Sequence, residues 1–216
     1  MPAAPRPAKL DPPLLERARR RLSRRDPVLG GVIRRVGRCD IRPLGDPYRQ
    51  LVRSVIYQQL QGKAAAAIAG RLRARHGGRF PAPHALLASS DAELREVGLS
   101  RQKIAALRSV AAAFADGSLD NRRLHRMDDA AVVEAVTRLH GIGEWTAHML
   151  LMFSMGRPDV LPVGDYGVRK GAMSLYRLRE LPRPKQLEAL GERWRPYRSV
   201  AAWYLWRHTE VRPPDA

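Results

Sequence analysis

Apolar residues recur at spacings of three and four along most of the chain, as expected for helices that each bury one face. No stretch shows the strict apolar–polar alternation of a β-strand over any length. The clearest helix opens at Asp46-Pro47, a capping residue and a residue suited to the first turn, and its stripe comprises Leu51, Val52, Val55, Ile56 and Leu60. The pattern therefore predicts an all-α fold.

Further helices are predicted by the same spacing over 64–72, from Ser90 to a stop at Gly98, and over 101–114, 128–139, 165–178, 185–194 and 197–208. His76-Gly77-Gly78 is a strong C-terminal stop, and Pro81 and Pro83 indicate a loop after it. Residues 149–153 are apolar around the whole helix circumference. We expect them to form a central helix enclosed by others.

The beginning of the chain differs in composition. Residues 1–13 contain five prolines and few large apolar side chains, so we expect a flexible N-terminal arm, with structure beginning near Leu14. The remaining residues, 14–216, are numerous enough to bury a substantial core as one helical domain of two lobes.

The charge balance indicates a polyanionic partner. Lysine and arginine number 39 against 21 acidic residues, a formal net charge of +18. Such a basic domain favours nucleic acid as the partner. Only five of the 39 are lysines, and the guanidinium fork of arginine suits phosphate, although a genome with arginine-biased codons would also explain that choice.

Other chemistries find little support. A lone cysteine, Cys39, excludes an intramolecular disulfide and a four-thiolate cluster, and the six histidines are scattered without zinc spacing. We therefore expect no catalytic metal. The chain shows neither a signal-like apolar run near its start nor an apolar segment of membrane-spanning length. The expectation is a cytoplasmic protein without membrane contact.

The most informative stretch is a glycine hairpin, Leu139-His140-Gly141-Ile142-Gly143-Glu144-Trp145-Thr146-Ala147. Glycine permits left-handed backbone angles, and its missing side chain lets main-chain N–H groups approach a phosphate at the start of the following helix. We expect Ile142 to tuck between the two helices. Taken alone, an ordinary helix–helix turn explains the motif equally well.

A second motif, Leu161-Pro162-Val163-Gly164-Asp165, makes the pattern specific. Together the two resemble the helix-hairpin-helix (HhH-GPD) DNA glycosylase superfamily, and most nearly its bacterial 3-methyladenine DNA glycosylase II type, with likenesses extending over about 46–210. The resemblance implies two helical lobes with the active-site cleft between them. One lobe comprises about 46–155 and the other the N-terminal helices with about 165–210; the 45 residues before Asp46 cannot supply the family's accessory β-rich lobe.

The activity that the resemblance implies is base excision repair by a monofunctional DNA glycosylase. It would flip out an alkylated purine such as 3-methyladenine and hydrolyse its N-glycosidic bond, leaving an abasic site. Positive charge develops on the sugar as the base departs, and the carboxylate of Asp165 is the candidate group to oppose it. By local pattern Asp165 is also an ordinary helix cap, and the two roles are compatible.

The resemblance also assigns roles to other residues. Trp145 stands where strand-cleaving relatives carry a Schiff-base lysine, which implies no lyase activity. Gln59 is the candidate DNA wedge, and the candidate walls of the base pocket are Tyr57, Trp145, Tyr166 and Trp206, with core packing as the alternative for Tyr166.

Contacts to the DNA backbone are expected from Gly141, Gly143, Thr146, Arg169 and Lys170. A structural Na⁺ or K⁺ is implied at the main-chain carbonyls of His140 and Ile142. The partner would be double-stranded DNA containing damaged bases, bound by a monomer in the nucleoid. Two alternatives stay open: a non-enzymatic DNA-binding module in which Asp165 only caps a helix, and a glycosylase for oxidised or deaminated bases.

Overall fold

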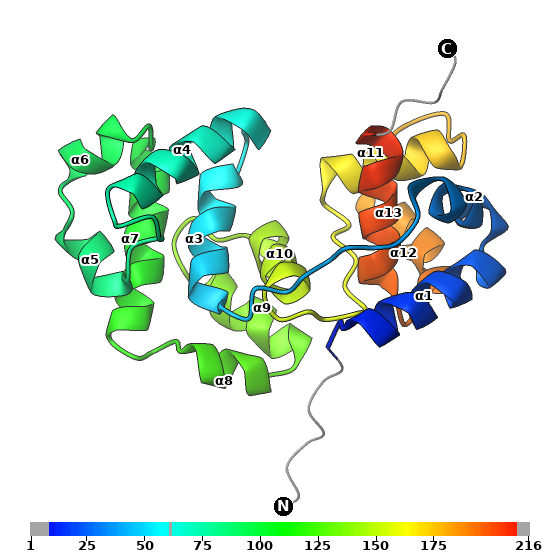
Figure 1. The fold of residues 1–216 in the computed structure, drawn as a ribbon, viewed down its shortest axis with the longest axis horizontal. Helices are drawn as coiled ribbons and strands as arrows, with labels where there is room; N and C mark the ends of the chain where they lie inside the picture. Colours follow the sequence, from blue (N-terminus) through cyan, green and yellow to red (C-terminus); the bar gives the residue numbers. More distant parts are fainter. Residues whose placement is uncertain (1–8, 61, 211–216) are drawn as a thin grey trace, which may run out of the picture. The chain divides into compact units, whose positions relative to one another are not determined.

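The computed structural model describes residues 9–60 and 62–210, and every regular element in these ranges is helical, which confirms the all-α prediction (Figure 1). The chain divides into two compact units. Unit 2 is the continuous segment Leu44–Met155, and unit 1 takes in the chain up to Pro43 and from Gly156 onward. The two units are described separately below.

Unit 2 is a cluster of eight helices in which α3 has a central place. The helices are α3 (Pro47–Tyr57), α4 (Gly62–Ala74), α5 (Pro83–Ala88), α6 (Asp91–Glu96), α7 (Arg101–Ala115), α8 (Asn121–Arg126), α9 (Asp129–Thr137) and α10 (Glu144–Phe153). The central helix α3 lies against α4, α7, α8 and α10 (Figure 1). Its predicted stripe is buried as far as Ile56, and the α10 residues 149–152 are buried as expected for an enclosed helix.

Local sequence signals set most helix ends in unit 2. The Asp46 carboxylate caps α3 by accepting from the Arg49 N–H, and Ser90 and Glu93 form a capping box at α6. At the end of α4, Gly77 and Gly78 take positive φ angles of 63° and 81°, as the predicted stop requires.

Two expectations for unit 2 were wrong in detail, and one helix was missed. Helix α3 ends at Tyr57 because Gln58 leaves the helical conformation with a ψ of 130°, so Leu60 is 39% exposed and does not extend the stripe. Pro83 starts α5 instead of extending a loop, since proline fits the first turn of a helix. Helix α8 was not predicted, because six residues are too few to show a helical period.

Unit 1 consists of α1 (Pro12–Arg25), α2 (Pro27–Val36), α11 (Tyr166–Leu175), α12 (Pro184–Gly191), the 3₁₀ helix η1 (Glu192–Trp194) and α13 (Arg198–Glu210). Helix α13 packs against α1, α2 and α11 (Figure 1). The buried carboxylate of Asp26 caps α2, and it also accepts hydrogen bonds from the hydroxyl of Tyr176 (2.6 Å) and the indole N–H of Trp194 (2.9 Å). This carboxylate therefore joins the two chain segments that make up unit 1.

The expected arm ends earlier than Pro13. Helix α1 starts at Pro12, and Leu10 is buried, with its N–H donating to the carbonyl of Gly156 at 2.7 Å. Residues 1–8, the larger part of the predicted arm, lie outside the described residues. No helix in the described ranges has the length and apolar character needed to cross a membrane.

Candidate active site

The carboxylate of Asp165 is fixed at the start of α11 by two hydrogen bonds within unit 1. Its Oδ1 atom accepts from the main-chain N–H of Val168 at 2.8 Å, the capping bond that the sequence predicted. The same oxygen accepts from the indole N–H of Trp206 at 2.8 Å. Two donors therefore fix the position of this oxygen at the N-terminal end of α11.

Space for the Trp206 indole is provided by a glycine in the first turn of α11. A Cβ atom on Gly167 would lie 2.8 Å from the indole Cδ1 atom and 3.2 Å from Oδ1 of Asp165. A second close approach occurs one turn later, where a Cβ on Gly171 would lie against the main-chain oxygen of Leu205. These two glycines let α11 and α13 approach closely enough for the indole to reach the carboxylate.

The other predicted residues on α11 have different settings. Tyr166 is 65% exposed, so core packing does not account for it. Lys170 is also exposed, as a contact with phosphate requires. The Arg169 guanidinium donates to the carbonyl of Pro182 at 2.8 Å, so this side chain also secures the segment between α11 and α12.

In unit 2 the glycine hairpin joins α9 to α10. Gly141 has a positive φ of 75°, and a Cβ there would lie 2.6 Å from the Cβ of Ala106. Both the backbone conformation and the close packing therefore require glycine at this position. Ile142 is buried, as predicted. Gly143 caps α10 without a side chain, and no protein atom lies within 4 Å of the place its Cβ would take. The first turn of α10 is therefore open to an approaching anion.

A glutamine that the sequence analysis overlooked connects this hairpin to the end of α3. The Gln58 side-chain amide donates to the carbonyl of Gly141 at 3.0 Å and to the hydroxyl of Thr146 at 3.1 Å. The Thr146 side chain is buried, so its contact with DNA would have to use the main chain. Position 59, the candidate wedge, follows directly, is exposed and has a positive φ of 54°.

Lys103 supports the same turn from α7. Its ammonium group donates to the carbonyl of Ile56 at 2.5 Å, and partial burial lowers the pKa of this lysine below its ordinary value. Neither Gln58 nor Lys103 carries a recognisable motif, because their importance comes from partners 83 and 47 residues away in the chain.

The remaining aromatic candidates are half-buried. Trp145 lies in the first turn of α10, and Tyr57 ends α3, where the guanidinium of Arg53 lies 4.9 Å from the centre of its ring. Predicted site residues are thus gathered around two features, the Asp165–Trp206 pair in unit 1 and the hairpin with its neighbouring turn in unit 2. In the described ranges, no group of three or more histidine, cysteine, aspartate or glutamate residues is placed to hold a metal ion.

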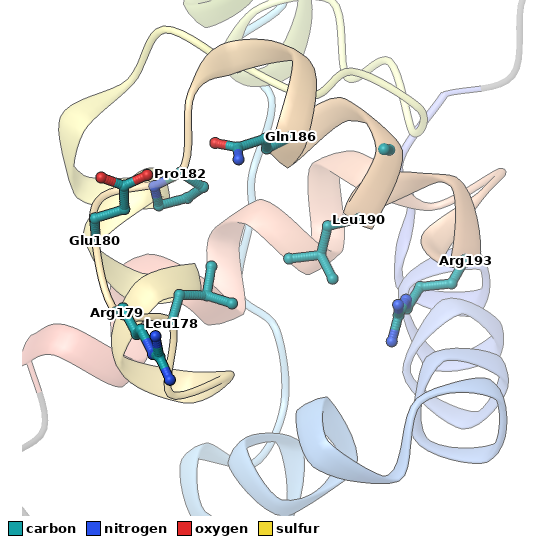
Figure 2. Close-up of a pocket in the computed structure, with 8 residues that line it drawn as sticks. Leu178, Arg179, Glu180, Pro182, Gln186, Leu190 and Arg193 are labelled. Carbon is teal, nitrogen blue, oxygen red and sulfur yellow. The ribbon is translucent and has the colours of Figure 1, made fainter.

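A hollow of about 500 Å³ in unit 1 is lined by none of the predicted residues (Figure 2). Leu178 and Leu190 extend into it from the segment after α11 and from α12, with Arg179, Glu180 and Arg193 at its edges. Neither Asp165 nor Trp206 lines this hollow, so we do not include it in the candidate active site.

The glycine hairpin before α10 and the carboxylate that caps α11 are the two features on which the resemblance to the helix-hairpin-helix class of DNA repair proteins rests. Residues 52–196 match the family model described as "HhH-GPD superfamily base excision DNA repair protein". The match covers more than half of the chain, and the protein therefore belongs to this superfamily.

Individual relatives agree with this assignment. DNA-3-methyladenine glycosylase 1 of Schizosaccharomyces pombe is 36% identical over 168 residues, which are 77% of this chain and 74% of that protein. The structure of the 3-methyladenine DNA glycosylase from the same yeast in complex with abasic DNA matches with a TM-score of 0.85 at 34% identity, covering 90% of this chain and 97% of that chain. A DNA-3-methyladenine glycosidase from Bacillus halodurans matches with a TM-score of 0.75 at 38% identity, covering 93% and 90%.

Proposed function

We propose that this protein is a DNA glycosylase of base excision repair that hydrolyses the N-glycosidic bond of alkylated purines such as 3-methyladenine. The observation that carries the proposal is the Asp165 carboxylate, held by the Val168 N–H and the Trp206 indole in a chain of this superfamily. The names of the relatives in yeast and Bacillus halodurans support the choice of lesion.

In the proposed reaction the bond between the sugar C1′ atom and the base nitrogen breaks, and the base leaves with the electron pair. Positive charge then develops on C1′ and the ring oxygen, and the fixed Asp165 carboxylate stabilises it. The oxygen of a water molecule bonds to C1′, and the proton that this water loses passes to the solvent. The products are a free base and an abasic site. Alkylation makes the purine cationic and a better leaving group, and electron-rich aromatic rings favour such a cation.

The proposal gives the hairpin the task of gripping DNA. Main-chain N–H groups in the first turn of α10 would meet a phosphate, since Gly143 adds no side chain there. Exposed Gln59 would fill the gap left in the base stack. The main-chain carbonyls of His140 and Ile142 would hold the family's monovalent cation. The Gln58 amide donates to the carbonyl of Gly141, which lies between them in the chain.

The absence of lyase activity is a further part of the proposal. Trp145 occupies the position two residues after the second hairpin glycine, where it offers no amine, and the Lys103 ammonium group is engaged by the carbonyl of Ile56. Hydrolysis by water would thus leave the DNA strand intact.

Asp165→Asn tests the reaction directly. The substitution keeps the cap and the shape but removes the negative charge, and we expect release of 3-methyladenine from methylated DNA to fall by about 10²–10³-fold. The assay counts released base by chromatography, with circular dichroism to confirm folding. Undiminished release by a folded variant would refute the catalytic role of Asp165, and a lack of release by both wild type and variant would favour a DNA-binding module.

Two further arms complete this experiment. Duplexes that each contain one alkylated, oxidised or deaminated base establish the lesion class, and release of an oxidised or deaminated base alone would overturn the choice of alkylated purines. Products run on a denaturing gel with and without alkali test the second part of the proposal. We expect strand breaks after alkali treatment alone; breaks at neutral pH would show lyase activity.

A further inference from the structure

Unit 2 contains a second basic feature that the proposed reaction does not use. A groove of about 460 Å³ lies along α3 and α4 and is closed by the segment that follows α4. The residues that carry its chemistry are Arg49, Arg53, Tyr57, Arg73, Arg79 and Phe80. We refer to it as the α3–α4 groove.

The helical period and a glycine turn build this groove. On α3, Arg49, Arg53 and Tyr57 follow one another at four-residue spacing and therefore share one face. After α4, the N–H of Gly78 donates to the carbonyl of Arg73 at 2.9 Å, which turns the chain so that Arg79 and Phe80 line the groove.

A buried tyrosine secures the returning segment. The hydroxyl of Tyr48 in α3 donates to the carbonyl of Pro81 at 3.0 Å, and burial raises the pKa of this hydroxyl above its ordinary value. Ala66 and Ala69 of α4 line the groove with small side chains, which leaves its interior open.

Two of the arginines lie over aromatic rings. The guanidinium carbon of Arg53 is 4.9 Å from the centre of the Tyr57 ring, and that of Arg73 is 5.8 Å from the centre of the Phe80 ring. Such a cation–π contact helps to hold the guanidinium in place, and its planar fork of N–H donors suits phosphate oxygens. The rings themselves offer faces and edges to a planar ligand.

The positive charge of the groove is largely unneutralised. Arg49 forms an ion pair with Asp46 at 3.1 Å. Within the part of the chain that the structure describes, the side chains of Arg53, Arg73 and Arg79 make no hydrogen bond or ion pair with a carboxylate. Gathering these like charges costs free energy that a bound anion would recover.

We propose that the α3–α4 groove binds a nucleotide, with phosphate on the free guanidinium groups and the base against the aromatic side chains. The groove would recognise a phosphate group and a planar unsaturated ring in the same ligand. Either an unpaired nucleotide of a DNA strand or a free nucleotide supplies both. The inference goes beyond the proposed glycosylase reaction and does not depend on it, because neither Asp165 nor the hairpin lines this groove. Tyr57 is the one candidate base-pocket residue among the residues that line it.

The test compares two variants that lose the same charge. Arg73→Gln/Arg79→Gln removes two groove cations, and Arg122→Gln/Arg126→Gln removes two exposed cations from α8 in the same unit. Fluorescence anisotropy measures the affinity of the full chain for a blunt duplex and for the same duplex with a single-stranded tail. Calorimetry measures binding of dAMP, with inorganic phosphate as the ring-free probe. Base release is assayed in parallel, so failure of the groove and failure of the glycosylase reaction are distinguishable.

For an unpaired DNA nucleotide, we expect the wild-type chain to bind the tailed duplex about 5- to 50-fold more tightly than the blunt one, as base stacking and phosphate contacts predict. The groove variant would lose this preference and the α8 variant would keep it. For a free nucleotide, dAMP would bind the wild type more tightly than phosphate does, again with loss confined to the groove variant.

Phe80→Leu provides a second variant without any change of charge. We expect it to weaken binding of the tail or of dAMP more than binding of phosphate, because it removes the ring face and keeps both arginines. The proposal is overturned if the wild type shows neither a preference for the tail nor binding of dAMP, or if both double variants lose affinity equally.

Discussion

Asp165 caps a helix with the same oxygen atom that the Trp206 indole holds in the candidate active site. Its Oδ1 atom accepts both the capping N–H of Val168 and the indole N–H of Trp206. The cap was predictable because it depends on residues three positions apart. The hydrogen bond from the indole was not predictable, because its donor is 41 residues away in the chain. From the sequence, Trp206 was expected only as a wall of the base pocket. The structure therefore adds a second role for Trp206, which is to orient the Asp165 carboxylate.

Gly167→Ala tests whether this orientation matters. The added methyl group would displace the indole from its present contact with the carboxylate, since the ideal Cβ lies 2.8 Å from Cδ1 and 3.0 Å from Nε1. We expect base release to fall at least tenfold, by about 1.4 kcal/mol in transition-state stabilisation. Steady-state kinetics on methylated DNA provides the measurement.

Gly70→Ala in α4 is the matched control. It also replaces a helical glycine, but no atom lies within 4 Å of its Cβ position, so activity should persist and stability should rise slightly. Equal activities of the two variants would show that the Trp206 bond is dispensable.

Among the secondary-structure elements, the connection between α3 and the hairpin is the arrangement that sequence reasoning missed. The chain period correctly predicted α3, and the glycines correctly predicted the hairpin. The period does not register the ψ of 130° at Gln58, which ends α3, or the positive φ of Gln59 after it, because glutamine has no special preference for either conformation. Gln58 then bonds to Gly141 and Thr146, a contact set by tertiary packing and invisible to local patterns.

Gln58→Ala removes this connection. It leaves the buried Thr146 hydroxyl without the Gln58 donor, so we expect a loss of about 1–2 kcal/mol in the free energy of unfolding. We also expect faster amide exchange in residues 139–143 and weaker binding of duplex DNA, because the hairpin is less well held. Urea unfolding, hydrogen–deuterium exchange and anisotropy measure these three effects.

Gln102→Ala serves as the control for that experiment. Gln102 is exposed on α7, so its removal should change stability by less than about 0.5 kcal/mol. If Gln58→Ala matches it in all three measurements, the hairpin does not depend on the glutamine.

For the whole molecule, the formal net charge of +18 predicts a strongly salt-dependent interaction with DNA. About four phosphate contacts would release enough counterions to weaken binding about 100-fold between 50 and 200 mM salt. Anisotropy of a labelled duplex at several salt concentrations checks this expectation. If the affinity falls only slightly as the salt concentration rises, the excess positive charge serves a purpose other than contact with the DNA backbone.

The division of the chain into an interior segment and two flanking segments bears on how the protein is made. All of Leu44–Met155 has been synthesised before α11, α12 and α13 exist, whereas α1 and α2 must wait for their partners. Asp26 in particular waits 150 residues for Tyr176 and 168 for Trp194. On the ribosome, unit 2 has its full sequence first, and the hairpin is complete while the Asp165 carboxylate still lacks Trp206. The order of translation thus leaves the completion of unit 1 until last.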